Sequence, residues 1–203
     1  MATATKTSSN DPVVEQKIRK LRELYADAPE LARVALEQGL AAFTGDLPAA
    51  TAQNAGRIGA RQGTVSELTT IFPVAKGAAK RVRGLLELLG GNFQGAERVG
   101  TVHDMRFVFL DNDTKMIFAT AYDGDWDSYI DDFATKIPNE MDVVFSNFEG
   151  WPGIRSPRVK DWIVEHQISA AGWYVANPNL TVAATRKLER VGKAVDELLD
   201  KIG

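Results

Sequence analysis

The order of strand-like and helix-like segments between residues 64 and 176 constrains the fold of this chain most. Three segments are rich in β-branched and aromatic residues or alternate between apolar and polar residues, as strands do: Ser66–Val74, Thr101–Leu110 and Lys115–Tyr122. Gly172–Ala176 has the same character and is expected to be a fourth strand. Apolar residues recur at helical spacing in the intervals, at Lys76–Leu89, Trp126–Ile137 and Val159–His166, with a short helix from Met141 to Phe148.

This order predicts an α+β domain with the split βαβ pattern of a ferredoxin-like fold. Such a domain has a four-stranded antiparallel sheet with helices on one face. The turn cluster Asp111-Asn112-Asp113 makes residues 101–122 a β-hairpin. Within this hairpin, Met105 and Phe107 lie in one alternation phase and Val108 and Leu110 in the other. Apolar residues in both phases indicate that both faces of the sheet are buried, so we expect a homodimer that pairs sheet to sheet.

Helical segments are expected on both sides of this domain. Residues 1–10 are predicted to be a frayed tail, and residues 11–63 a helical extension that starts at the capping pair Asp11-Pro12. Two short helices cannot bury both of their faces alone, so this extension is expected to pack on the main domain or on another subunit. The domain proper is predicted to cover residues 64–203 and to end in a long helix, Leu180–Ile202, with an apolar face.

Composition excludes several classes of protein. The chain has no cysteine, which excludes disulfides, thiolate metal sites and a cysteine nucleophile. A net charge of −3 argues against nucleic acid as a partner. No apolar run reaches the roughly 18–20 residues that span a bilayer, and residues 1–10 lack the apolar core of a secretory signal. We therefore expect a cytoplasmic protein without a membrane partner.

Three stretches of the chain resemble a known superfamily. They are Glu67–Gly77, Gly100–His103 followed by Arg106–Val108, and Tyr122–Phe133. Together with the element order over residues 64–178, they are similar to the dimeric α/β-barrel superfamily, and in particular to bacterial sequences described as peroxidase-like. The superfamily includes haem enzymes and cofactor-free monooxygenases. The resemblance implies a dimeric α/β barrel and makes haem the expected cofactor.

Only two histidines, His103 and His166, are available to such a site. His103 enters the second strand, and on the free face of the sheet it could ligate haem iron or act as a general base; the alternative is a hydrogen bond that caps the strand end. His166 lies near the end of a helix, where superfamily haem enzymes often place their iron ligand. It is the candidate metal ligand, and its alternative is an interaction with the helix dipole.

Two further residues complete the predicted site. Arg106, in the interior of a strand, could bind a haem propionate or a substrate carboxylate, or could pair with a nearby aspartate. Trp173 could form part of an aromatic wall against a flat ligand, or could simply pack in the core. The cavity is expected on the free face of the sheet and lined by Met105, Phe107 and either Phe72 or Trp173.

Three functions are compatible with these residues. The first is a haem-binding oxidoreductase, peroxidase-like or related, in which His103 or His166 ligates iron and Arg106 stabilises negative charge. The second is a cofactor-free enzyme of the monooxygenase kind, acting on an apolar or aromatic small molecule in the same cavity. The third is a non-enzymatic ligand-binding or assembly subunit, in which the N-terminal helices dock on a partner.

Overall fold

The computed structural model describes residues 11–42, 53–88 and 94–202. The chain divides into two compact units, Met1–Thr51 and Ala52–Gly203. The predicted tail, residues 1–10, lies outside the described residues, as do residues 43–52 of the predicted helical extension.

The first unit is a pair of helices, α1 (Pro12–Leu24) and α2 (Glu30–Ala42), as predicted. The Asp11 side chain accepts a hydrogen bond from the Val13 N–H at 2.8 Å, which satisfies one of the free amides at the start of α1. The Arg22 guanidinium donates to both carboxylate oxygens of Glu37, each at 2.8 Å, and so joins the two helices. This hydrogen bonding lowers the pKa of the exposed Glu37 carboxyl.

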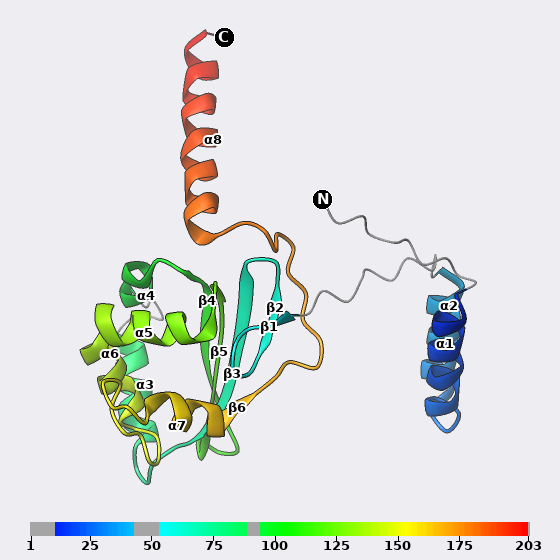
Figure 1. Ribbon diagram of the computed structural model, residues 1–203, viewed down its shortest axis with the longest axis horizontal. Helices are drawn as coiled ribbons and strands as arrows, with labels where there is room; N and C mark the ends of the chain where they lie inside the picture. Colours follow the sequence, from blue (N-terminus) through cyan, green and yellow to red (C-terminus); the bar gives the residue numbers. More distant parts are fainter. Residues whose placement is uncertain (1–10, 43–52, 89–93, 203) are drawn as a thin grey trace. The chain divides into compact units, whose positions relative to one another are not determined.

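The second unit is built on one antiparallel sheet (Figure 1). The strands pair in the order β1-β2-β3-β5-β4, and β6 also pairs with β3. Their bounds are β1 (Gln53–Asn54), β2 (Ala60–Gln62), β3 (Val65–Pro73), β4 (Val102–Leu110), β5 (Lys115–Asp123) and β6 (Gln167–Ile168). The α+β class, the antiparallel sheet and the three long strands are therefore as predicted.

The predicted fourth strand, Gly172–Ala176, is wrong. The segment that pairs with β3 is β6, which lies earlier in the chain, with Thr69 opposite Ile168 and Thr70 opposite Gln167. The N-terminal end of the same β3 edge is already taken by β2, which pairs with Val65 and Ser66. Only a short length of the β3 edge is left for further pairing. Residues 172–176 therefore have no strand to pair with there, despite their strand propensity.

The predicted boundary at residue 63 also changes. Residues 53–62 were expected to belong to the helical extension, but β1 and β2 form a hairpin in the sheet of the second unit. Local composition there is small and polar, with weak propensity for any element. Pairing with β3 therefore decides the conformation.

The predicted hairpin is present as β4 and β5, with Leu110 opposite Lys115. Asp111, Asn112 and Asp113 all have positive φ, between 50° and 67°, the left-handed region that aspartate and asparagine tolerate better than most residues. The register shifts between Val102 and Asp104, so His103 lies in a β-bulge at the start of β4.

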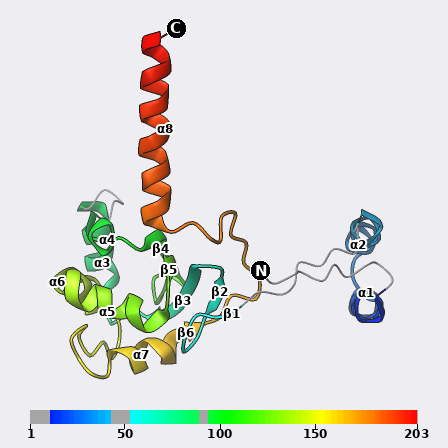
Figure 2. The same ribbon diagram turned by 45° about the horizontal axis from the view of Figure 1, so that its top comes forward.

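Five helices complete the body of the second unit and lie together on one side of the sheet (Figures 1 and 2). Their buried residues pack with Leu68, Phe72, Met116, Phe118 and Tyr122, which project from the same face of β3 and β5. The helices are α3 (Ala79–Leu88), α4 (Gln94–Val99), α5 (Trp126–Lys136), α6 (Pro138–Phe145) and α7 (Val159–His166).

The chain ends in α8 (Val182–Ile202), as predicted, two residues later than its expected start. The Val182 N–H donates to Asp123 Oδ2 at 2.9 Å, so the last residue of β5 anchors the beginning of α8. In the part of the chain that the structure describes, no helix has the length and apolar character that a membrane crossing requires.

The opposite face of the sheet is more open. Register places Ile71, Ile117 and Val108 side by side on this face, in β3, β5 and β4 respectively. Ile71 and Ile117 are half-buried, and Val108 is 43% exposed. The face is thus apolar but only partly covered by the described residues of one chain.

Replacing Phe72 by alanine tests how much of the stability rests on the helix-covered face. Phe72 is buried and stacks on Trp162, with ring centroids 4.7 Å apart. Its loss is expected to lower the free energy of unfolding, measured by urea titration, by about 3–5 kcal/mol. Tyr174→Ala, at a ring that is 85% exposed, is the control and is expected to change it by no more than about 0.5 kcal/mol. Equal effects of the two variants would contradict this description of the core.

Candidate functional site

A cavity of about 630 Å³ lies between β4 and β5 and the helices that face them. Its walls are mainly apolar, and aromatic rings come from four different elements. The lining residues nearest the sheet are Met105, Phe107 and Phe118, and those on the helices include Leu85, Phe133, Ile137, Met141, Val144 and Phe145. A volume in this range is typical of sites for small molecules.

The cavity arises because β4 is the edge strand. Phe118 on β5 is buried, whereas Met105 and Phe107 on the same face of β4 are only half-buried. Phe107 still packs against the Phe118 ring at 4.9 Å and lies 6.2 Å from the Phe145 ring. The helices therefore cover β4 less completely than β5, and the uncovered space is bounded by aromatic rings.

Polar groups are confined to the part of the lining formed by α4 and α6. Arg98 Nη2 donates to Glu140 Oε1 there, and Asn139 lies beside them. A hydrogen bond from its own backbone and a second one from Arg98 lower the pKa of the exposed Glu140 carboxyl. Among the described residues that line the cavity there is no histidine, serine, threonine or lysine. The described lining thus offers apolar contact and one ion pair, without an imidazole, a hydroxyl of serine or threonine, or a lysine amine.

The sequence correctly places Met105 and Phe107 in a cavity but assigns them to the wrong face. They were expected on the free face of the sheet, together with Phe72 or Trp173. In the structure they project towards the helices, because Met105 pairs with Thr120 and Phe107 with Phe118. Phe72 lies on the same face but further along, stacked on Phe148 and Trp162.

His103 lies outside the cavity lining. Its Nε2 is 2.8 Å from Asp123 Oδ1, and the other oxygen of that carboxylate accepts from the Val182 N–H. The bulge at Val102/Asp104 turns His103 away from the strict alternation of β4. His103 therefore helps to hold the carboxylate that begins α8, which is the strand-end hydrogen bond given above as its alternative.

Arg106 lies on the open face, opposite Ala119, and its side chain is 63% exposed. Its Nη2 is 2.6 Å from Asp104 Oδ2, two residues away on the same strand. Of the two alternatives for Arg106, pairing with a nearby aspartate is the one that the geometry favours. An ion pair this exposed contributes little to stability.

His166 and Trp173 are separate from the cavity as well. The Nδ1 of His166 is 2.7 Å from the Trp162 carbonyl oxygen, and its ring packs against Trp162 and Phe72 at 4.4 and 5.5 Å. Trp173 is half-buried, and its carbonyl accepts from Gln62 Nε2 at 2.8 Å. The four predicted site residues thus do not converge on one place.

These positions do not fit a haem group. Haem ligation by histidine needs an imidazole that faces an apolar space large enough for the macrocycle. In the described residues the apolar space has no imidazole in its lining, and one ring nitrogen of each histidine is hydrogen-bonded away from that space. The described residues also contain no cluster of three or more histidine or carboxylate side chains that could hold a metal ion.

Sequence reasoning missed Glu67, a buried carboxylate on β3. Its Oε1 accepts from the N–H groups of Ala60 and Ala170, at 3.1 and 3.2 Å, and its Oε2 accepts from Thr69 Oγ1 at 3.0 Å. Glu67 therefore ties β3 to β2 and to the segment after β6. The sequence feature that could have identified Glu67 is that it is the single charged residue in a strand-like segment.

Comparison with known proteins assigns neither a family nor a function to the chain. No family model matches the sequence, and neither the curated proteins nor the solved structures yield a significant match.

Replacing Glu67 by leucine tests its structural role. Two part-buried backbone N–H groups would lose their acceptor, and each donor left unsatisfied costs on the order of 1 kcal/mol or more. The free energy of unfolding is therefore expected to fall by at least about 2 kcal/mol. Glu87→Leu, on the exposed surface of α3, is the matched control and should leave it nearly unchanged. A Glu67→Leu variant as stable as the control would show that the carboxylate is dispensable.

Proposed function

We propose that this protein binds a small, mainly apolar molecule in the cavity between β4, β5 and the helices. The observation that carries the proposal is the cavity itself, about 630 Å³ with aromatic and aliphatic walls. Apolar walls stabilise a ligand by removing its surface from water, and a few polar groups then orient it. Arg98, Glu140 and Asn139 are the polar groups available for this.

The lining favours a ligand with an aromatic part and one polar end. Phe107, Phe118 and Phe145 present rings at different angles, which suits offset or edge contacts with another ring. Met105 and Met141 add flexible side chains that adapt to shape. At the polar end, the Arg98 guanidinium can donate to a ligand carboxylate in place of Glu140.

This proposal combines two of the three expected functions. A binding protein needs only the cavity, and a cofactor-free enzyme for an apolar molecule would use the same cavity. The lack of imidazole, serine or threonine hydroxyl and lysine groups in its described lining favours binding. The haem-binding oxidoreductase receives no support from the positions of His103, His166, Arg106 and Trp173.

A fluorescent probe tests the cavity directly. Anilinonaphthalene sulfonate has fused aromatic rings and one anionic group, and its fluorescence rises in apolar surroundings. We expect saturable binding at one site per chain. Gly95→Leu should weaken it at least tenfold, because a Cβ at Gly95 lies 3.5 Å from Ile137 Cδ1 and a larger side chain would fill the cavity.

Gly84→Leu is the matched control. It adds the same side chain to a helix at a position with no heavy atom within 4 Å, away from the cavity lining. Arg98→Gln should weaken binding of the anionic probe by up to about fivefold, as expected for the loss of an exposed ion pair. Equal affinity of the Gly95→Leu and Gly84→Leu variants, or binding without saturation, would overturn the proposal.

Haem titration separates the proposal from the haem alternative. We expect no Soret band that depends on either histidine. A Soret band lost in His103→Ala or His166→Ala would restore the haem-binding oxidoreductase as the better hypothesis. Conversion of a bound apolar molecule by protein free of haem and metal would instead favour the cofactor-free enzyme.

We also infer that two copies pair through the open face of the sheet, as in a dimeric α/β barrel. The strand order β4-β5-β3-β6, with helices on one face, is the order of a ferredoxin-like domain and supports this arrangement. The half-buried Ile71 and Ile117 beside the exposed Val108 form the apolar surface that such pairing would cover.

Light scattering after size-exclusion chromatography tests this pairing. Both proteins compared carry Val195→Glu, which puts a charge on the exposed apolar face of α8 so that this helix does not hold copies together. In that background, Val108→Glu would put a charge into the interface between the sheets and is expected to halve the mass of the assembly. Val143→Glu, on an exposed position of α6, is the control and should leave the mass unchanged. The same mass with and without Val108→Glu in this background would contradict sheet-to-sheet pairing.

A further inference from the structure

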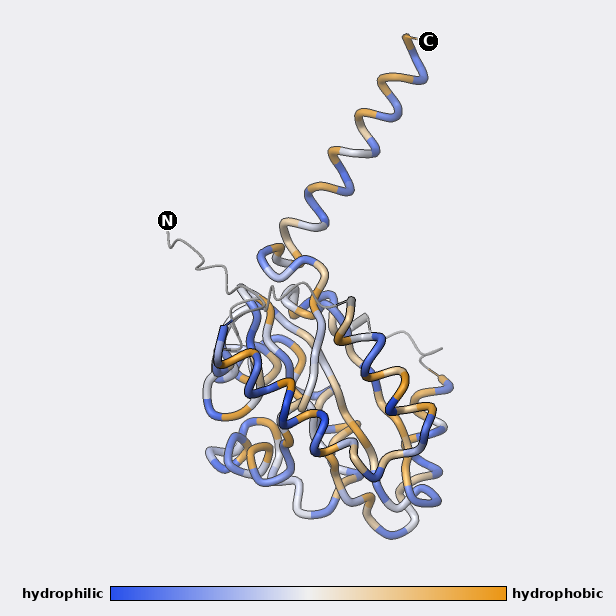
Figure 3. Tube along the Cα trace, turned by 90° about the vertical axis from the view of Figure 1, so that its right-hand side faces the viewer, coloured by the Kyte–Doolittle hydropathy of each residue, from blue (hydrophilic) through white to orange (hydrophobic). Residues whose placement is uncertain are grey.

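The C-terminal helix α8 carries an apolar face that the described residues of its own chain leave uncovered. Val182, at the anchored first turn, is the only buried residue of the helix. Figure 3 shows hydrophobic and hydrophilic residues recurring in turn along its length. Six large apolar side chains are between 47% and 72% exposed: Leu188, Val191, Val195, Leu198, Leu199 and Ile202.

The spacing of these residues is that of a helix that packs against another helix. The intervals from Leu188 to Val191, Val195, Leu198 and Ile202 alternate between three and four residues. This is the heptad spacing that keeps one line of apolar side chains facing a partner helix. We call this line of five residues the seam. Exposed apolar surface of this regularity on a charged helix marks an interaction surface.

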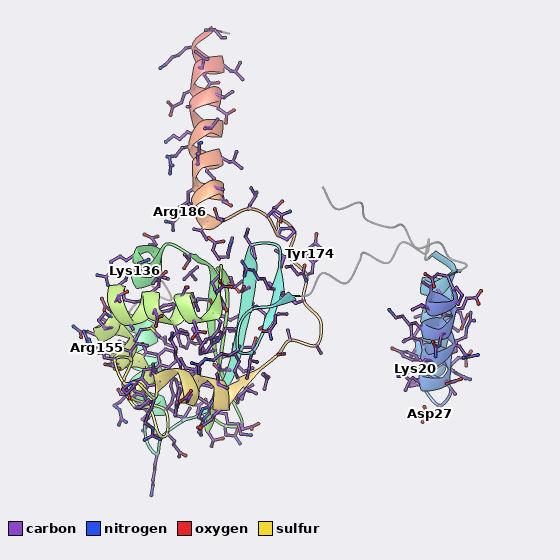
Figure 4. The ribbon with its side chains drawn as sticks, viewed as in Figure 1. Lys20, Asp27, Lys136, Arg155, Tyr174 and Arg186 are labelled. Carbon is purple, nitrogen blue, oxygen red and sulfur yellow. The ribbon has the colours of Figure 1, made fainter. Side chains whose placement is uncertain are left out.

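Charge along α8 is divided between its two halves. Cations predominate in the first half, with Arg186, Lys187, Arg190 and Lys193 against Glu189. Anions predominate in the second half, with Asp196, Glu197 and Asp200 against Lys201. Figure 4 marks Arg186 at the beginning of the helix. A parallel neighbour of the same sequence would place like charges together, whereas an antiparallel neighbour places each cationic half beside an anionic half.

We propose that α8 pairs antiparallel with α8 of a second copy of this chain. The apolar pattern is self-complementary under a two-fold axis, as an interface between identical copies requires. The charges are complementary in part: Arg186 is level with Asp200 and Arg190 with Asp196 of the second copy, whereas Glu189 is level with Glu197. The register that buries most apolar residues places Leu188 opposite Leu198, Val191 opposite Val195, and Ala184 opposite Ile202. The axis then passes near Lys193. Antiparallel helix dipoles add a further favourable contribution.

A lipid surface fits this helix less well. Anionic headgroups attract cations along the whole polar face of a membrane-bound helix. Here Asp196, Glu197 and Asp200 occupy the second half, where such headgroups would repel them. In an antiparallel pair, the same acidic residues lie beside the cationic half of the second copy.

Site-specific cross-linking tests both the pairing and its direction, because the chain has no cysteine of its own. In the proposed pair, Ala194→Cys lies next to the axis, with the two copies about 3 Å apart along the helix direction. Thr185→Cys lies eight residues from the axis, so its two copies are separated by about 24 Å. A short bismaleimide is therefore expected to link Ala194→Cys efficiently and Thr185→Cys hardly at all.

The other outcomes overturn the proposal. Linking of both variants would indicate parallel helices, and linking of neither would show that α8 does not meet its own copy. The reaction is run over a range of protein concentrations and again with Val195→Glu added to Ala194→Cys. The added charge in the seam should reduce the cross-linked fraction at least fivefold. Ala183→Glu, exposed and off the seam, is the matched control and should leave it unchanged.

The design also separates α8 pairing from sheet-to-sheet pairing. Val195 is half exposed on α8, so its substitution is not expected to disturb the sheet, and circular dichroism checks that helix content is retained. If Val195→Glu leaves cross-linking at residue 194 unchanged, another part of the molecule brings the copies together, and the proposed seam is wrong. If cross-linking and its loss both occur as expected, α8 is an interface between copies irrespective of the sheet face.

Discussion

The pairing of β3 with β5 is the interaction on which the rest of this structure depends. Every residue of β3 has an antiparallel partner in β5, so the two strands share one alternation along their whole length. This pairing turns Leu68, Phe72 and Phe118 towards the helices and Ile71 and Ile117 towards the open face. The aromatic core, the position of the edge strand and the division of the sheet into a covered and an open face all follow from it.

The position of β4 at the edge then decides where a ligand can bind. A central strand is covered by helices along its length. Among the described residues, β4 has one neighbouring strand, and the helices cover it incompletely. Met105 and Phe107 therefore line a cavity instead of filling a core. The histidines are excluded from it by ordinary packing, since His103 bonds Asp123 at a strand end and His166 stacks at the end of α7.

Local patterns in the sequence were enough to predict the three long strands, the hairpin turn at residues 111–113 and most of the helices. Each of these has a strong local signal, such as helical spacing or a cluster of turn residues. The short strands were not predictable in this way. β6 has only two residues, and β1 and β2 lie in a small, polar stretch, so only the vacant edge of β3 gives them their conformation.

The sequence by itself determined that this chain is a mixed α+β protein, that two histidines were the only ones available to any site, and that its last helix carries an apolar seam. Those features depend on composition and on spacing along the chain. Only the tertiary structure decided which face of β4 is covered and that His103, Arg106, His166 and Trp173 lie apart from the cavity. A side chain's direction in a strand depends on register with its neighbours, and a bulge such as that at His103 changes it without a strong local signal.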